Sequence, residues 1–447
     1  MKAGRHIIED VTIVNEGERY HASVHIENGR IAEIVKALPK RGSGEEAFLL
    51  PGIIDGHVHM REPGLTHKAT MESETRAAAR GGVTTVLDMP NVVPQTTTLQ
   101  LLQERYALAE GRCHVNYGFY LGATNDNIEE IRRLDPAACP GVKLFMGSST
   151  GNMLVDKEAA LRGIFRHSPA LIVTHCEDTE RINSLTLSLT KREGIFSSLP
   201  SPPPLEELGV AYHPLIRDHE ACYRSSALAV RLAREEGARL HVAHISTAKE
   251  LELFNPDDDR ITAEACVPHL LFTDEDYATL GALIKCNPAI KTKADRSALR
   301  KALTDGRIRT VATDHAPHLL SEKQGGCLKA VSGMPMVQFS LPAMLSLVDE
   351  GVLSIERLVE LMCHNPARLY RIKERGFIRE GCRADLVLVR RKPWTLSKDC
   401  IESRCGWSPL EGRTFNWQVE QTWVNGNLVW DGTSFPLQPE GRRVEFV

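Results

Sequence analysis

Short apolar runs alternate with longer amphipathic stretches through the middle of the chain. Strands that alternate with helical stretches predict repeated βα units and a parallel sheet. The runs that fit strands are residues 52–59, 83–89, 114–121, 141–146, 170–175, 239–244, 260–265 and 308–314. Eight is the number that a closed barrel needs. The pattern therefore predicts an α/β chain with a TIM-like (β/α)8 barrel over residues 51–375.

The two ends of the chain have a different pattern. Residues 1–50 and 376–447 contain short alternating runs, with hairpin signals at Asn28-Gly29 and Asn425-Gly426. Two unrelated appendages would explain this, but we expect one small β-sandwich domain built from both ends. Residues 197–214 are too rich in proline for regular structure and are expected to form a long loop before a helix near Asp218.

Composition narrows the class of protein. The 447 residues are 42% hydrophobic and 25% charged, which is typical of a soluble globular enzyme. The net charge of -4 is spread along the chain, so nothing indicates a nucleic-acid partner. We expect no signal peptide and no membrane span, because long apolar runs are absent from the sequence. Eleven cysteines without a C-x-x-C pair argue against a disulfide framework and favour a cytoplasmic location.

Unusual polar residues lie in or at the ends of the predicted strands. His57 and His59 are two apart, so both side chains point to one face of the first strand. The others are Lys143, His175, His244 and Asp314. One such histidine is usually a hydrogen-bonded structural residue. All six at strand ends indicate a metal site, because a barrel builds its active site at the carboxyl ends of its strands. The strand period places His241 and His315 on the other face, outside the ligand set.

Several motifs carry a resemblance to a known family. The run DGHVHMREPG (55–64) resembles the metal-binding opening of the long-type dihydroorotases, cyclic amidases of the amidohydrolase superfamily. Similar motifs follow in family order: DMPN (88–91), VKLFMGSSTGNMLVD (142–156), THCED (174–178), HVAHIST (241–247), NPAIK (287–291), ATDHAPH (312–318) and SPLEG (408–412). The H-x-H pair alone is common to the superfamily, whereas the full set is specific.

The resemblance implies a centre of two Zn²⁺ ions. His57 and His59 would bind one ion, which Asp314 would also reach, and His175 and His244 would bind the other. A carbamylated Lys143 would bridge the two ions, although some relatives use an aspartate instead. An ammonium group cannot bind a cation, but a lysine that has captured carbon dioxide is an anion. Asp314 would also carry the proton between the attacking water and the departing amide nitrogen.

The resemblance also implies a substrate site. Arg61 would bind a substrate carboxylate through two parallel hydrogen bonds from its guanidinium. The other residues that would contact the substrate are Asn91, Asn287 and His318, and Gly333 would offer a backbone group to the substrate ring. The sequence around Gly333 departs from the common family pattern, as does NPAIK. The remaining histidines that we expect to be structural are His67, His213, His219, His269 and His364.

The expected function is the reversible cyclisation of N-carbamoyl-L-aspartate to L-dihydroorotate in pyrimidine (UMP) biosynthesis. One alternative is another cyclic amidase, either a dihydropyrimidinase (hydantoinase) or an allantoinase, whose substrates lack the carboxylate that Arg61 would bind. A second alternative is an inactive subunit that scaffolds aspartate transcarbamoylase, which would be expected to have lost metal ligands. Relatives suggest a homodimer, with aspartate transcarbamoylase as the candidate protein partner.

Overall fold

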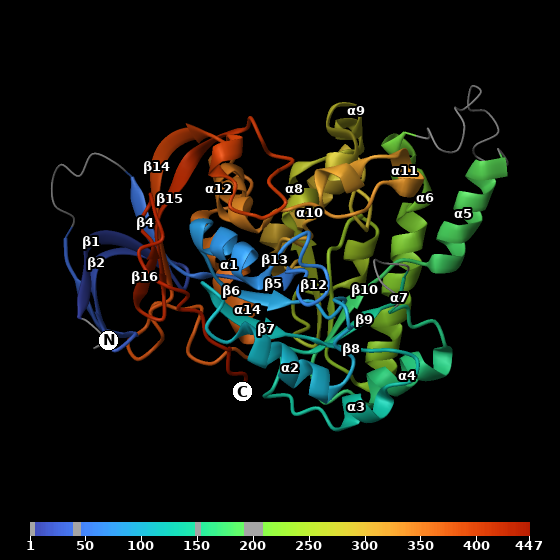
Figure 1. The fold of residues 1–447 in the computed structure, drawn as a ribbon, viewed down its shortest axis with the longest axis horizontal. Coiled ribbons are helices and arrows are strands. Elements are labelled where there is room, and N and C mark those ends of the chain that lie inside the picture. The colour runs from blue at the N-terminus through green and yellow to red at the C-terminus, as the bar shows by residue number, and fades with distance from the viewer. Residues whose placement is uncertain (1–4, 39–45, 148–152, 192–208) are drawn as a thin grey trace.

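The computed structural model describes residues 5–38, 46–147, 153–191 and 209–447 (Figure 1). Its centre is a barrel of parallel strands: β5 (Ile53–Val58), β6 (Val83–Asp88), β7 (Asn116–Phe119), β8 (Leu121–Gly122), β9 (Val142–Phe145), β10 (Ile172–His175), β11 (Leu240–Val242), β12 (Ile261–Cys266) and β13 (Thr310–Ala312). The strand orders are β5-β6-β7 and β13-β12-β11-β10-β9-β8. Only Tyr120 separates β7 from β8, so we count the two together as one strand of the barrel. All eight predicted strands are therefore present in the predicted order.

The barrel closes between its first and last strands. Val58 forms a parallel bridge with His315, and the His59 amide donates to the His315 carbonyl at 2.7 Å. The strands are buried along their whole length, so their residues come from near-continuous apolar runs. This closure brings the carboxyl ends of β5 and β13 together, where the sequence places His57, His59 and Asp314.

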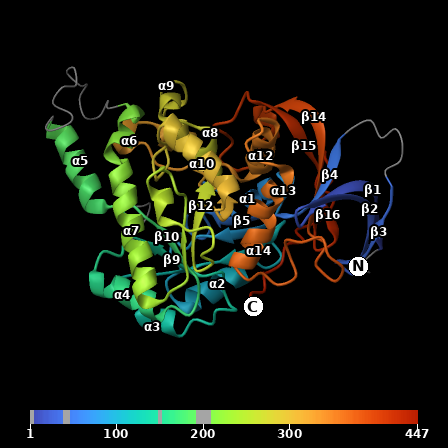
Figure 2. The ribbon, with the colours of Figure 1, turned by 180° about the vertical axis from the view of Figure 1, so that it is seen from behind.

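Helices surround the barrel strands (Figure 1). Their bounds are α1 (Met71–Arg80), α2 (Leu99–Ala109), α3 (Ile128–Arg132), α4 (Glu158–His167), α5 (Thr179–Lys191), α6 (His213–Ile216), α7 (His219–Glu236), α8 (Val267–Leu271), α9 (Tyr277–Leu280), α10 (Lys293–Asp305), α11 (Gly326–Lys329), α12 (Ser340–Asp349), α13 (Ile355–Val359) and α14 (Asn365–Leu369). As predicted, α7 begins beside Asp218, whose side chain accepts from the Ala221 amide. Figure 2 shows α12 and α13 between the barrel strands and the outer sheet.

The proline-rich segment was expected to be irregular over residues 197–214. Residues up to 208 lie outside the described part of the chain. From Val210 to Tyr212 the chain instead forms a 3₁₀ turn, and α6 follows directly. Pro214 lies in the first turn of α6, where the missing N–H of proline leaves no hydrogen bond unmade. The expectation of a loop was wrong for this part of the segment.

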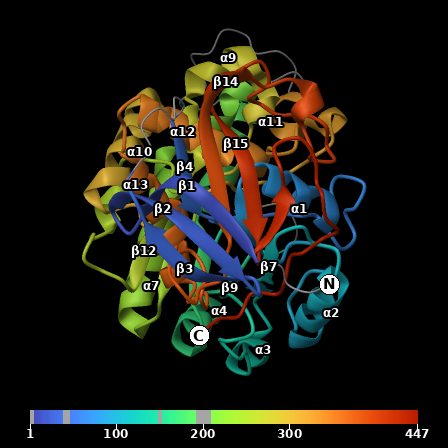
Figure 3. The same cartoon turned by 90° about the vertical axis from the view of Figure 1, so that its left-hand side faces the viewer.

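Both ends of the chain meet in one sheet, which faces the viewer in Figure 3. Its strands are β1 (His6–Asn15), β2 (Glu18–Glu27), β3 (Arg30–Lys36), β4 (Ala47–Pro51), β14 (Leu386–Thr395), β15 (Thr414–Val424) and β16 (Asn427–Trp430). The order is β16-β15-β14-β4-β1-β2-β3, with β4 antiparallel to β14. Asn28 and Asn425 have φ of 52°, as the two predicted hairpin turns require. The two ends therefore form a joint unit, as predicted.

The last residues of the chain return to the barrel. Arg443 forms a parallel bridge with Tyr117, and Phe446 forms an antiparallel bridge with Ile372. Val444 and Phe446 pack in one apolar cluster with Ile54 of β5. We propose barrel limits at residues 51 and 375, with this final segment as an addition to the barrel. All eleven cysteines are free thiols, and no helix among the described residues has the length and apolarity to cross a membrane.

Candidate metal centre

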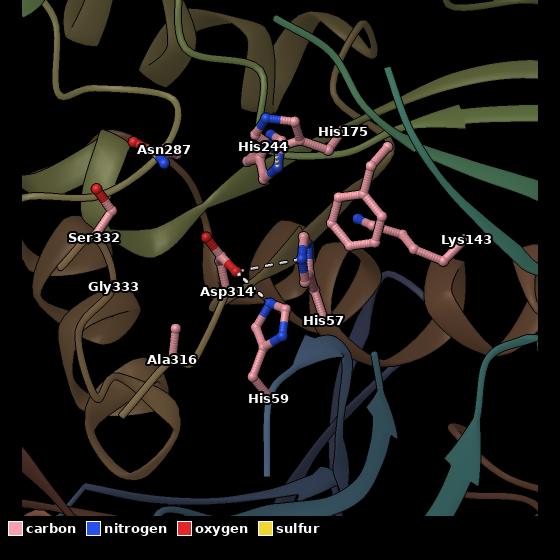
Figure 4. Close-up of a pocket in the computed structure, with 11 residues that line it drawn as sticks. His57, His59, Lys143, His175, His244, Asn287, Asp314, Ala316, Ser332 and Gly333 are labelled. Atoms are coloured by element: carbon pink, nitrogen blue, oxygen red, sulfur yellow. Dashed lines mark hydrogen bonds and ion pairs between the residues drawn. The ribbon is translucent and has the colours of Figure 1, made fainter. Parts of the chain in front are cut away.

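Three of the predicted ligands converge at the point where β5 and β13 meet (Figure 4). The Nε2 atoms of His57 and His59 lie 3.3 and 3.1 Å from Asp314 Oδ1. One ligand atom from each of these residues lies within 4.8 Å of the other two. Two imidazole nitrogens and a carboxylate oxygen so arranged are a donor set that suits zinc.

Outer hydrogen bonds fix the orientation of the two imidazole rings. His57 Nδ1 lies 2.8 Å from Glu264 Oε1, and His59 Nδ1 lies 2.8 Å from Asn91 Oδ1. Because both oxygens are acceptors, each Nδ1 carries the proton and donates it. A neutral ring then has its lone pair on Nε2, the atom that faces Asp314. Glu264 and Asn91 thereby prepare both rings to bind a cation.

A second pair of histidines lies across the cavity. His175 ends β10 and His244 lies just beyond β11, and His175 Nδ1 is 2.9 Å from His244 Nε2. Burial lowers the pKa of His59 to about 4 and lowers the pKa values of His175 and His244 below their ordinary value. These imidazoles are therefore neutral near pH 7, which is the form that binds a metal.

Lys143 is the least ordinary residue of the centre. It lies on β9, its side chain is fully buried, and its Nζ has no hydrogen-bond partner among the described residues. The amine lies 5.2 Å from the centroid of the Phe145 ring. Burial lowers the pKa of this amine. A buried polar group without a partner is costly, so its position indicates chemistry that folding alone does not require.

The donor set fits a divalent metal. Besides Lys143 Nζ, the buried His244 Nδ1 has no hydrogen-bond partner within the described chain. Burial alone would raise the pKa of Asp314, but His57 and His59 bring it below its ordinary value, so it is a carboxylate. The six predicted ligands line a cavity of about 30 Å³. Its lining consists of His57, His59, Lys143, Phe145, His175, His244, Asn287, Asp314, Ala316, Ser332 and Gly333.

Backbone strain is concentrated at the same place. His244 and Asp314 have φ of 40° and 48°, and Arg61 has φ of 64°. Residues other than glycine seldom adopt these left-handed conformations, and such strain collects at functional sites. Three predicted site residues therefore have a backbone that the surrounding structure must hold in place.

The predicted substrate residues fall into two groups. Asn287 and Gly333 line the cavity. Arg61 and His318 are not among its lining residues. Arg61 Nη2 lies 2.9 Å from His318 Nε2, and His318 Nε2 lies 3.0 Å from the carbonyl of Ser332, which is one of the lining residues. Asn91 bonds to His59 and is not among the lining residues of the cavity. The substrate roles of all five residues stay predictions.

Other histidines bond away from the cavity. His241 contacts Thr262 and His315 contacts Glu74, so both lie outside the ligand set, as the strand period predicts. Four of the histidines expected to be structural have protein partners, namely His213 with Cys286, His219 with Asp295, His269 with Pro288 and His364 with Gly376.

Sequence reasoning missed two acidic residues of the site. Glu264 contacts both His57 Nδ1 and, at 3.2 Å, the His244 amide. Glu177 Oε2 lies 3.1 Å from His175 Nε2 and forms an ion pair with Arg217. The available signal was an acidic residue inside a fully buried strand, which Glu264 is, because such a residue needs a buried partner.

Known proteins share this architecture. Residues 48–429 match the sequence pattern described as the Amidohydrolase family. The chain belongs to the amidohydrolase family. This amidohydrolase is 34% identical over 389 residues to a dihydroorotase of Halobacterium salinarum, covering 86% of each chain. It is 30% identical over 448 residues to an allantoinase of Streptomyces avermitilis, covering 96% of each. The solved L-hydantoinase (dihydropyrimidinase) of Arthrobacter aurescens superposes with a TM-score of 0.89 at 27% identity, covering 98% of this chain and 99% of that one.

Proposed function

We propose that this cyclic amide hydrolase is a dihydroorotase, which interconverts N-carbamoyl-L-aspartate and L-dihydroorotate in pyrimidine synthesis. The observation that carries the proposal is Arg61. Its side chain is 3% exposed, and no carboxylate of the described residues forms an ion pair with it. A buried cation without a direct ion-pair partner is costly, so a ligand that carries a carboxylate fits this position.

The contacts of Arg61 leave part of its guanidinium for such a ligand. Its Nε donates to the Pro317 carbonyl at 3.0 Å, and its Nη2 donates to His318 Nε2. Burial lowers the pKa of Arg61 to about 10, which still leaves the group charged at neutral pH. The planar fork matches a carboxylate in two hydrogen bonds. Dihydroorotate carries a carboxylate on its ring, whereas dihydrouracil and hydantoin carry none there.

The relatives support the wider class of cyclic amidases, since they include an allantoinase and a hydantoinase. Those activities are the alternative function. Arg61 argues against them, because their substrates lack the carboxylate that it would bind. An inactive scaffolding subunit is a weaker alternative, because all six predicted ligands are present and line one cavity. A homodimer, an aspartate transcarbamoylase partner and a cytoplasmic location are further parts of the proposal.

Two zinc ions would fit the donor set described above. His57, His59 and Asp314 would hold one ion, and His175 and His244 the other. Lys143 would bridge them after its neutral amine forms an N–C bond to carbon dioxide and releases a proton, which leaves a carboxylate. Bound zinc supplies a polarised carbonyl and a water whose pKa is lowered to roughly 7.

The remaining steps belong to side chains of this chain. Asp314 is held as a carboxylate beside His57 and His59, and accepts the proton of the attacking water. It returns this proton to the departing amide nitrogen in ring opening. Arg61, His318 and Asn287 hold the substrate, Gly333 contributes a backbone group, and Asn91 keeps His59 oriented.

A comparison of substrates tests the proposal. Metal-loaded protein should open dihydroorotate with a kcat/KM on the order of 10² or more above that for dihydrouracil, hydantoin and allantoin, because charge-assisted hydrogen bonds are strong. Arg61→Met should remove this preference and leave the metal content unchanged. Arg61→Lys keeps the charge without the fork and should retain part of it. Near-normal turnover of dihydroorotate by Arg61→Met, or faster opening of an uncharged ring by the parent protein, would assign the chain to the hydantoinase or allantoinase class.

A further inference from the structure

A second cavity lies at the opposite end of the barrel from the metal centre. Its volume is about 470 Å³, within the range of small-molecule sites. Arg239, Arg260 and Arg309 line it, and each is the residue directly before a strand, namely β11, β12 and β13. The cavity therefore opens at the amino ends of three successive parallel strands.

Two more arginines complete the lining. Arg368 lies in α14 and Arg371 lies just beyond it. The wall thus holds five guanidinium groups and one carboxylate, that of Asp259. Asp259 Oδ1 lies 3.0 Å from Arg309, but its side chain is 88% exposed, so its charge is largely screened.

The other four arginines have no carboxylate partner among the described residues. Arg239 donates to the Leu369 carbonyl at 2.8 Å, and Arg260 donates to the Gly237 carbonyl. Burial lowers the pKa of Arg239, and the nearby charges of Arg371 and Arg260 lower it further. Cations that repel each other around one cavity raise the local positive potential, which concentrates anions there.

We propose that this cavity binds a small anion that carries a di- or triphosphate group. Arginine forks match phosphate oxygens in paired hydrogen bonds. Four guanidinium groups without a carboxylate partner favour an anion with several charges over a single carboxylate. Asn365, buried in the same wall, accepts from Arg368 Nη1 at 3.2 Å and so orients that guanidinium. This inference does not depend on the proposed reaction, because none of these residues lines the metal centre.

Calorimetric titration of the metal-loaded full chain with inorganic pyrophosphate tests the site. The parent protein should bind one pyrophosphate per chain, and orthophosphate should bind more weakly. The double variant Arg260→Gln/Arg371→Gln should lose at least tenfold in affinity. Both side chains are exposed, so the substitutions leave the core intact. Arg260→Lys/Arg371→Lys keeps the charges but not the forks, and should fall between the two.

Arg404→Gln is the matched control. Arg404 is an exposed arginine whose amide contacts Glu74 of α1, and it is not among the lining residues of the arginine cavity. Its variant should bind pyrophosphate like the parent. The proposal is overturned if pyrophosphate does not saturate, or if the double variant loses no more affinity than Arg404→Gln. Metal content measured after each titration identifies heat that comes from removal of metal. Heat from removal of metal would persist in the double variant, and such a result would contradict the proposed anion site.

Discussion

Strands β11 and β13 each have an arginine at the amino end and a predicted metal ligand at the carboxyl end. Arg239 precedes β11 and His244 follows it, while Arg309 precedes β13 and Asp314 follows it. The members of each pair are five positions apart in the sequence, which corresponds to roughly 16 Å of extended chain. Because the strands of the barrel are parallel, every carboxyl end lies on one side and every amino end on the other. The same register therefore places the candidate metal ligands at one end and guanidinium groups at the other.

The two ends also differ in burial. At the carboxyl end His57, Lys143 and His244 are 1%, 0% and 3% exposed, and outer carboxylates orient the rings. At the amino end Arg260 and Arg371 are exposed. A buried, fixed donor set suits catalysis, which needs preorganised groups. A cavity lined by partly and fully exposed arginines suits reversible capture of an anion. Substitutions should consequently have much larger effects at the carboxyl end.

The largest effect is expected from Lys143→Ala. Removal of the proposed bridge should lower metal content and reduce turnover by a factor on the order of 10³ or more, since a metal ion supplies several kcal/mol. Short carboxylic acids should partly restore activity, because they can occupy the space of the lost side chain. Elemental analysis and ring-opening rates measured with and without acetate provide the check. Full activity in Lys143→Ala would contradict the proposal that Lys143 bridges two metal ions.

The next largest effect is expected from Asp314→Asn. The amide oxygen can still reach a cation, so most of the metal should remain, but an amide cannot accept and return a proton. Turnover should fall by a factor on the order of 10² to 10⁴, the usual worth of a positioned proton shuttle. Because His57 and His59 hold the pKa of Asp314 below its ordinary value, the parent should keep this base ionised at neutral pH. A metal-loaded variant with near-normal rates would transfer the proton role to another group, with His318 as the candidate.

The strands, and the six residues that line one cavity at their carboxyl ends, could be predicted from the sequence because both signals are local. An apolar run predicts a buried strand, and a histidine at its carboxyl end falls on a known edge of a barrel. Glu264 could not be assigned in this way, because its partner His57 is 207 residues away and becomes a neighbour only on barrel closure. The arginine cavity was equally hidden, since each arginine before a strand resembles an ordinary surface residue. Asn91 shows the remaining limit: its place after β6 was predictable, but its contact with His59 was not.

Glu264→Gln should have a moderate effect on the carboxyl end. Glutamine can still accept from His57 Nδ1, but it lacks the charge that favours the imidazole as a donor. Metal affinity or activity should fall by roughly 10 to 100-fold, as for other residues that orient a ligand. Competition with a metal chelator measures the affinity. Glu177→Gln is the matched variant on the His175 side, and equal loss in both would show that the two histidine pairs depend alike on outer carboxylates.

The smallest effect is expected from Asp295→Asn, in the first turn of α10. Asp295 accepts from the Ala248 amide at 2.9 Å and from His219 Nε2 at 2.7 Å. Burial would raise its pKa, but the hydrogen bonds from His219, Thr292 and Ala248 lower it to about 2. A lowered pKa contributes stability above the unfolded value of about 4 and loses it as pH falls towards 2.

Urea unfolding of the parent and of Asp295→Asn at several pH values checks this expectation. The variant should be less stable by about 1 kcal/mol at pH 7, in line with loss of a helix cap. The difference should shrink as the pH falls from about 5 to about 2, because the parent then loses the charge. A difference that stays constant with pH would show that shape, and not charge, determines the role of Asp295.

The central claim is that the carboxyl end of the barrel holds two metal ions bridged by a modified Lys143. The most direct measurement combines the number of metal ions per chain with the mass of the Lys143 peptide, under conditions that preserve a carbamate. We predict two zinc ions per chain and a peptide heavier by one carbon dioxide, with both features lost in Lys143→Ala. One ion or none per chain, together with an unmodified Lys143, would contradict the claim.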